Sequence, residues 1–186
     1  MTTSRRGQIL ARSAELFAAH GFHGVSINDV GAACGISGPA LYRHFASKDA
    51  MLAEMLVSIS ERLLSVGRQR LAESESPEES LRALIGWHTE FALEHKPLIV
   101  VQERDWAQLP DDARQQVRRS QSAYVALWVD EVCRLRPGLD RRRSEAGVHA
   151  VFGLLNSTPH SARLSKARMR TMLEAMAWSA LADVQA

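Results

Sequence analysis

The sequence predicts an all-α fold of about nine helices, with a three-helix N-terminal domain (residues 1–47) followed by a larger helical domain (residues 48–186). Two observations lead to this prediction. Apolar residues recur at helical spacing through most of the 186 residues, and the alternation of Val, Ile and Thr that is typical of strands is absent. Glycine or proline stands at most of the expected breaks between helices.

The first two helices have recognisable ends. A helix over residues 4–20 is expected to stop before Gly21, which can adopt the positive φ of a C-terminal cap. A second, short helix is expected to begin at Ser26, whose hydroxyl can cap the free amides while Asp29 reaches back to it. This helix should end near Gly35, where a sharp turn is possible.

The remaining helices are placed by the same signals. A third short helix is expected from Ser37 to Phe45, because Pro39 is tolerated in a first helical turn. An apolar stripe then predicts a long helix over residues 47–71. Further helices are expected at about 78–95, 97–108, 110–136, 141–158 and 164–182, separated by proline-bearing segments.

Composition restricts the class of protein. The hydrophobic (46%) and charged (24%) fractions are ordinary for a globular protein, and no apolar stretch is long enough to cross a bilayer. The N-terminus has no apolar signal core, so we expect a cytoplasmic protein without membrane contact. Cys34 and Cys133 have no metal-ligand spacing, so neither a zinc site nor a disulfide framework is expected.

Positive charge is concentrated at the N-terminal end. Residues 1–50 contain five basic and three acidic side chains, whereas the rest of the chain contains 18 of each. An anionic partner is therefore expected to bind the N-terminal domain. Histidines are scattered through the larger domain without a nucleophile, a phosphate-binding loop or metal spacing, so no catalytic residues are expected.

Two short helices joined by a glycine turn, directly after a longer helix, are typical of a helix-turn-helix over residues 26–45. The run from Ser26 to Leu52 closely resembles the signature of the TetR family of bacterial regulators. It contains a serine that opens the third helix, then Leu-Tyr-Arg-His-Phe at 41–45 and Lys48. The resemblance implies a DNA-binding homodimer with a separate effector domain.

The resemblance implies a division of labour on DNA. Ser26, Tyr42, His44 and Lys48 are expected to contact phosphates. The residues expected to face the major groove are Asn28, Ser37, Gly38, Pro39, Ala40 and Arg43. Our hypothesis adds Arg5 and Arg6 as a flexible arm in the minor groove, the alternative being that both are simply solvated.

The larger domain contains most of the large aromatic residues. They either fill a core or line an effector cavity whose few polar groups orient the ligand. The residues considered for such a cavity are Trp87, His88, Phe91, Arg104, Trp106, Tyr124, Trp128, Phe152 and Asn156. The segment 101–110 and the arginine-rich helix after it are similar to family members that sense acyl-CoA thioesters, although exposed helix arginines also explain this pattern.

The last two helices, 141–158 and 164–182, carry more apolar surface than one layer of packing needs, and in the family these helices form the dimer interface. A two-fold dimer predicts a palindromic operator in double-stranded DNA. We therefore expect a repressor that a small-molecule effector releases from DNA, through the long helix 47–71. The alternative is a DNA-binding regulator controlled by a protein partner instead of a small ligand.

Overall fold

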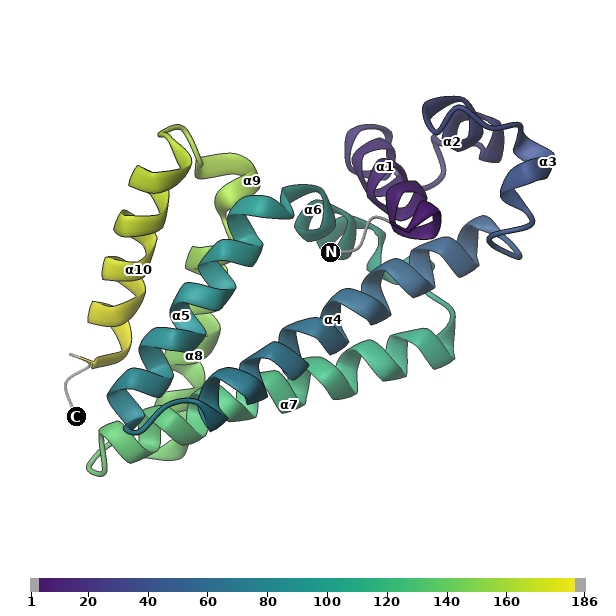
Figure 1. Ribbon diagram of the computed structural model, residues 1–186. Helices are drawn as coiled ribbons and strands as arrows, with labels where there is room; N and C mark the ends of the chain where they lie inside the picture. Colours follow the sequence, from purple (N-terminus) through teal and green to yellow (C-terminus); the bar gives the residue numbers. More distant parts are fainter. Residues whose placement is uncertain (1–3, 183–186) are drawn as a thin grey trace. The chain divides into compact units, whose positions relative to one another are not determined.

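The computed structural model describes residues 4–182, and every regular element in that range is helical (Figure 1). The predicted all-α fold is therefore confirmed. The ends of the two predicted domains, residues 1–3 and 183–186, lie outside the described residues. In chain order the elements are α1 (Arg5–His20), α2 (Ile27–Ala33), α3 (Gly38–Leu41), α4 (Lys48–Ala72), α5 (Pro77–Glu94), α6 (Lys96–Asp105), the 3₁₀ turn η1 (Trp106–Gln108), α7 (Asp111–Leu135), α8 (Arg141–Asn156), α9 (Thr158–Ser161) and α10 (Lys166–Ala182).

Short polar side chains determine where several helices begin. Ser4, Ser26, Ser37 and Ser76 each accept a hydrogen bond from a backbone N–H in the first turn of the helix that follows, and Asp140 does the same for α8. Each such bond satisfies a backbone donor that has no partner within the helix. The expected cap at Ser26 is confirmed, and the third helix begins after Ser37 as expected, with the Ser37 hydroxyl as its cap.

Two boundaries differ from the prediction. The third helix ends at Leu41 instead of Phe45, and its last residues form turns in which the N–H groups of His44 and Phe45 both donate to the Leu41 carbonyl. The single-turn helix α9 follows α8, in a segment where Pro159 led us to expect a break. Proline within a first helical turn does not interrupt the hydrogen bonds of that turn, so a short helix forms there.

The chain folds into two compact units. The first consists of residues 4–59 and 97–117, so a segment from the middle of the chain completes the core of the N-terminal helices. This segment contains α6, η1 and the start of α7. The buried apolar residues of this core include Ile9, Phe17, Phe22, Val30, Leu41, Phe45, Leu52, Leu56, Val101, Leu109 and Val117.

The second unit consists of residues 60–96 and 118–182. Within it, α5, α8 and α10 pack against one another (Figure 1). Its core includes Leu81, Leu84, Tyr124, Trp128, Val132, Val148, Val151, Leu155, Met169 and Leu173.

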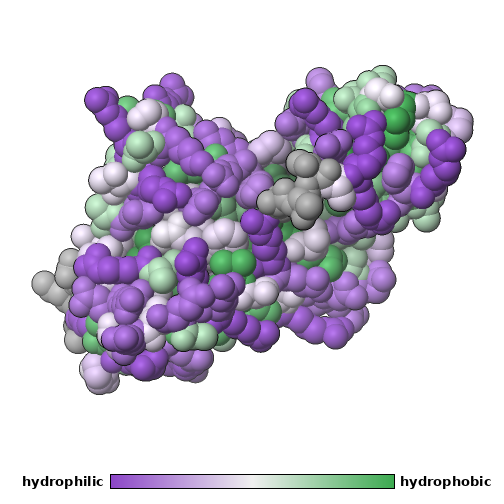
Figure 2. Space-filling view, viewed as in Figure 1, coloured by the Kyte–Doolittle hydropathy of each residue, from purple (hydrophilic) through white to green (hydrophobic). Residues whose placement is uncertain are grey.

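The face shown in Figure 2 is mostly hydrophilic, with small separate hydrophobic areas. Within residues 4–182, no helix combines the length and apolar character that a membrane span requires.

Candidate DNA-binding surface and effector site

The start of α2 is held by a reciprocal capping box. Asp29 N donates to Ser26 Oγ over 3.1 Å, and Ser26 N donates to Asp29 Oδ2 over 2.8 Å. The Ser26 hydroxyl also donates to Asp29 Oδ2, over 2.6 Å. The hydrogen bonds from Ser26 lower the pKa of Asp29, because they stabilise the carboxylate. The hydroxyl expected to meet a phosphate thus has a structural partner in the free protein.

The turn between α2 and α3 depends on two glycines. Gly35 has a φ of +66°, as predicted for the sharp turn. Gly31 allows the backbone of the turn to approach α2, because a Cβ there would lie 2.8 Å from the Ile36 carbonyl oxygen. Ile36 N donates to the Gly31 carbonyl over 3.0 Å, which holds the two segments together. Gly31 is therefore required by packing.

Most of the predicted DNA-contacting residues on the helix-turn-helix are exposed to solvent. Asn28, Pro39, Tyr42 and Arg43 are all exposed, and the Tyr42 side chain is unusual among large apolar residues in being 57% exposed. Ser37 is also exposed, while Ala40 and His44 are half-buried. Exposed tyrosine, arginine and asparagine side chains are of the kinds that can contact phosphates and base edges.

Gly38 does not fit the predicted face, because it is buried. A Cβ at this position would overlap Oδ1 of Asn28. Gly38 therefore provides the space that the Asn28 carboxamide occupies, and the expectation that Gly38 itself presents an apolar surface to DNA is wrong. The residue that covers Gly38 is Asn28, which is itself among the residues predicted to face the major groove.

Lys48 has partners that the sequence did not indicate. Its ammonium donates to the carbonyls of Phe22, over 2.7 Å, and Val25, over 2.9 Å, and it lies 4.3 Å from the centre of the Phe22 ring. These bonds fix the loop between α1 and α2. An ammonium has three N–H donors, so the two carbonyl bonds are compatible with a further contact to phosphate.

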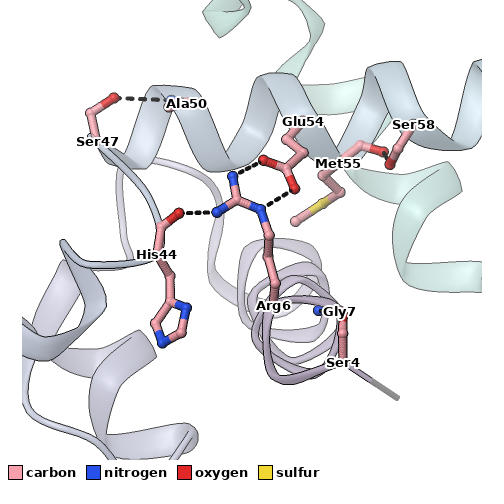
Figure 3. A network of polar contacts seen from close by, with 9 residues as sticks. All are labelled: Ser4, Arg6, Gly7, His44, Ser47, Ala50, Glu54, Met55 and Ser58. Carbon is pink, nitrogen blue, oxygen red and sulfur yellow. Dashed lines mark hydrogen bonds and ion pairs between the residues drawn. The ribbon is translucent and has the colours of Figure 1, made fainter. Parts of the chain in front are cut away.

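Arg5 and Arg6 lie in the first turn of α1, and the prediction that they form a flexible arm is wrong. Arg5 Nη2 donates to the Cys34 carbonyl over 2.5 Å, at the end of α2. Arg6 binds both carboxylate oxygens of Glu54 and the carbonyl of His44 (Figure 3). The arm was predicted because the pair is near the terminus, but Ser4 caps the helix in front of them.

Six of the nine residues considered for an effector site lie together in the second unit, in an aromatic cluster centred on His88. The His88 ring stacks on Phe152 at 4.7 Å and on Tyr124 at 5.8 Å between ring centres. Phe91 and Trp128 each approach it edge-on at 5.9 Å. The sixth residue is Asn156, whose Oδ1 lies 3.1 Å from His88 Nε2. The core and cavity alternatives thus concern the same set of side chains.

Burial controls the ionisation of this cluster. It lowers the pKa of His88 to about 4, although the hydrogen bond to Asn156 acts in the opposite direction. Burial also raises the pKa of the Tyr124 phenol. Both groups are therefore neutral near pH 7. Neutral polar groups among aromatic rings are suited either to a packed core or to a largely apolar ligand with one polar end.

Trp87 lies in the second unit but belongs to a different contact, in which its Nε1 donates to the Leu63 carbonyl over 3.3 Å. The guanidinium of Arg62 lies 5.6 Å from the centre of the Trp87 ring. Arg62 was missed by the sequence prediction. No local signal distinguishes an arginine that turns inward from one on a solvated helix face.

Arg104 and Trp106 belong to the first unit, whereas the His88 rings belong to the second. Arg104 Nη1 donates to the Ala18 carbonyl over 3.1 Å, and its Nη2 binds the Phe17 carbonyl and Asp105. Asp105 is buried and accepts a bond from Phe22 N. Arg104 therefore holds the C-terminal end of α1, which is a structural role that the sequence did not predict.

The helices predicted to form the dimer interface use much of their apolar surface within the chain. Val148, Val151, Met169 and Leu173 are buried inside the second unit. Beside charged and polar residues, the exposed positions on α8 and α10 include small or flexible apolar ones, namely Ala146, Ala150, Gly153, Met172, Ala175, Met176 and Ala180. Met172 and Met176 are 41% and 47% exposed.

Among residues 4–182, no group of three or more His, Cys, Asp or Glu side chains could hold a metal ion.

Two family models match the chain. The model described as bacterial regulatory proteins of the tetR family matches residues 9–55, and the model described as the tetracyclin repressor-like C-terminal domain matches residues 74–160.

Curated relatives and solved structures agree with these matches. The HTH-type transcriptional repressor KstR2 of Mycobacterium tuberculosis is 28% identical over 158 residues, which cover 83% of this chain and 78% of KstR2. The HTH-type transcriptional activator FasR of Mycolicibacterium smegmatis is 31% identical over 161 residues, 86% of this chain and 71% of FasR. A TetR-family regulator from Bordetella parapertussis has a crystal structure with a TM-score of 0.86, 27% identity and 99% coverage of both chains.

Two more distant solved structures share the fold and were determined with acyl-CoA. AibR in complex with isovaleryl coenzyme A and operator DNA has a TM-score of 0.71 and 19% identity, covering 93% of this chain and 97% of AibR. FadR from Bacillus subtilis in complex with stearoyl-CoA has a TM-score of 0.74 and 14% identity, covering 96% and 98%. From the two family models, the FasR relative and the capped helix-turn-helix, we conclude that the chain belongs to the TetR family of DNA-binding transcriptional regulators.

Proposed function

We propose that this protein is a homodimeric repressor that binds a palindromic operator through the helix-turn-helix and leaves it when a small molecule binds the second unit. The observation that carries DNA recognition is the exposed group Asn28, Pro39, Tyr42 and Arg43 on the capped helix-turn-helix. Ser37, Ala40 and His44 flank it. Ser26 and Lys48, whose structural bonds are described above, remain proposed phosphate contacts. Such a regulator would act in the cytoplasm, where bacterial DNA lies.

The dimer is proposed to form through the outward faces of α8 and α10, whose small residues and exposed methionines allow close packing of a second copy. A two-fold dimer presents two identical helix-turn-helix units, so the operator should have two inverted half-sites.

DNA binding is tested by selecting duplexes from a random library and measuring affinity by fluorescence anisotropy. We expect an inverted repeat to be enriched. Tyr42→Ala should weaken binding to it about ten-fold, the effect of one good contact. A failure to enrich any sequence, or enrichment of a single half-site alone, would contradict the proposal.

For the effector, we propose an acyl-CoA thioester whose acyl group meets the His88 cluster. The acyl-CoA complexes of AibR and FadR support the chemical class, and the apolar rings around His88 support the apolar end. The test is a thermal shift series with acyl-CoAs of increasing chain length, with free CoA and free fatty acids as controls. Binding to the folded state raises the melting temperature. No stabilisation by any thioester would reject this class.

A second candidate mechanism is control by a protein partner without a small ligand. The close ring contacts around His88, 4.7 to 5.9 Å between centres, favour it, because they are those of a packed core. Fluorescence anisotropy of the operator complex with added acyl-CoA distinguishes the two mechanisms, because release by a purified acyl-CoA requires no partner protein.

A further inference from the structure

One guanidinium in the first unit connects three segments of the helix-turn-helix domain (Figure 3). Arg6, at the start of α1, donates from Nε to Glu54 Oε1 over 2.6 Å and from Nη2 to Glu54 Oε2. Its third nitrogen, Nη1, donates to the backbone carbonyl of His44. The carbon of the guanidinium lies 4.2 Å from the centre of the Phe45 ring.

These contacts determine what Arg6 can do. A guanidinium that binds a carboxylate through two parallel bonds has a fixed orientation, and here the remaining nitrogen is directed at the His44 carbonyl. His44 lies in the turn after α3, directly after the exposed Tyr42 and Arg43. That turn is not part of a regular helix, and the backbone hydrogen bonds from the N–H groups of His44 and Phe45 join it to Leu41 of α3, not to α1 or α4.

We propose that Arg6 and Glu54 are positioning residues for DNA recognition, which act through the His44 turn and do not contact DNA themselves. The proposal rests on the DNA-binding function proposed above. Glu54 orients the guanidinium, the guanidinium holds the His44 carbonyl and the Phe45 ring, and the turn then presents Tyr42, Arg43 and His44 to the phosphates and bases.

Glu54→Ala gives opposite results under the competing mechanisms. Removing an acidic side chain beside a DNA-binding surface raises DNA affinity if only net charge matters. It also raises affinity if Arg6 contacts DNA, because the guanidinium loses its competing partner. The positioning mechanism predicts that Glu54→Ala lowers affinity about ten-fold, the effect of one charge-assisted contact on an equilibrium.

The experiment measures affinity for the selected operator by fluorescence anisotropy at several salt concentrations, using Arg6→Ala, Glu54→Ala and the double variant. We expect each single variant to weaken binding and the double variant to be no weaker than Arg6→Ala, because both remove the same interaction. The charge-swapped protein, Arg6→Glu with Glu54→Arg, can keep the ion pair but has no donor at residue 6 for the His44 carbonyl, so it should bind as weakly as Arg6→Ala. If Glu54→Ala strengthens binding, the proposal is wrong.

A second measurement separates positioning from a general loss of stability. In a His44→Ala background, the loss caused by Arg6→Ala should shrink, because the side chain that the turn presents is already absent. Equal losses in both backgrounds would show a merely structural role. Should Arg6→Ala unfold, Arg6→Lys keeps the charge without the two-pronged bond and should show the same coupling to His44.

The matched control is the ion pair between Arg12 and Glu15, which also involves α1 and is 2.8 Å long. Both of its members lie on the same helix, so it joins no two elements. Arg12→Ala with Glu15→Ala should leave operator affinity within about two-fold, as exposed pairs contribute little. If the wild-type protein selects no operator, the proposed function fails; if it does and the Arg6 variants bind equally well, only the positioning role fails.

Discussion

Asn28 occupies a space that exists only because residue 38 is glycine. Any larger residue there would push the Asn28 carboxamide away from its position on the exposed face of the helix-turn-helix. Gly38 was predicted to contact DNA itself, but its role in the structure is to leave room for Asn28.

This gives a prediction at the scale of one methyl group. Gly38→Ala should weaken operator binding about ten-fold by displacing Asn28, but should have little further effect when Asn28 is already alanine. Fluorescence anisotropy on the four proteins of this cycle provides the measurement. Gly138→Ala is the control, because a Cβ at residue 138 meets no atom within 4 Å. Equal losses in both Asn28 backgrounds would contradict the prediction.

His88 makes stability depend on pH. Its pKa is about 4 in the folded protein and about 6.5 when unfolded, so the unfolded chain binds more protons between these values. Stability is therefore lost as the pH falls through this window, by about 2 kcal/mol between pH 7 and pH 5. Urea unfolding at both pH values should show this loss, and His88→Phe should reduce it. The same pH dependence in both proteins would show that other groups are responsible.

At the scale of elements, the loop between α1 and α2 is held from two sides within the first unit. Lys48 of α4 binds the carbonyls of Phe22 and Val25, and Asp105 of α6 accepts the N–H of Phe22 over 3.4 Å. Arg104, next to Asp105, binds the carbonyls at the end of α1. The loop leads directly into Ser26, so α4 and α6 both fix the start of the helix-turn-helix.

Removing the lysine should loosen this loop. Lys48→Met keeps most of the aliphatic stem but loses two hydrogen bonds from a charged donor, so the free energy of unfolding should fall by about 2 kcal/mol. Urea unfolding followed by tryptophan fluorescence measures this. Arg43→Met, at an exposed position, should change stability by less than about 0.5 kcal/mol. A Lys48 variant as stable as wild type would show that the carbonyl bonds contribute nothing.

For the whole molecule, the proposed dimer makes a prediction about assembly. Met172→Glu with Met176→Glu places charges on the outward face of α10, where burial against a second copy would be costly. Light scattering should show a monomer for this variant, and operator affinity should fall because the half-sites are no longer bound together. Ala72→Glu, at the exposed end of α4, is the control and should remain a dimer. A dimeric Met172/Met176 variant would place the interface elsewhere.

The sequence by itself determined what depends on near neighbours. The helices, the caps at Ser26 and Ser37, the positive φ of Gly35 and the helix-turn-helix all follow from interactions within a few residues, which spacing and residue type reveal. The family signature added the exposed face around Tyr42 and Arg43.

Only the tertiary structure decided which partner each long polar side chain takes. Arg6 meets Glu54, 48 residues away, and Arg104 meets Phe17, 87 residues away. Tertiary structure also decided that Gly38 is buried against Asn28 and that residues 97–117 pack with the N-terminal helices. Helical periodicity specifies which face of a helix is apolar, but not which helix covers that face or at what angle, and a long side chain binds whatever that packing brings within reach.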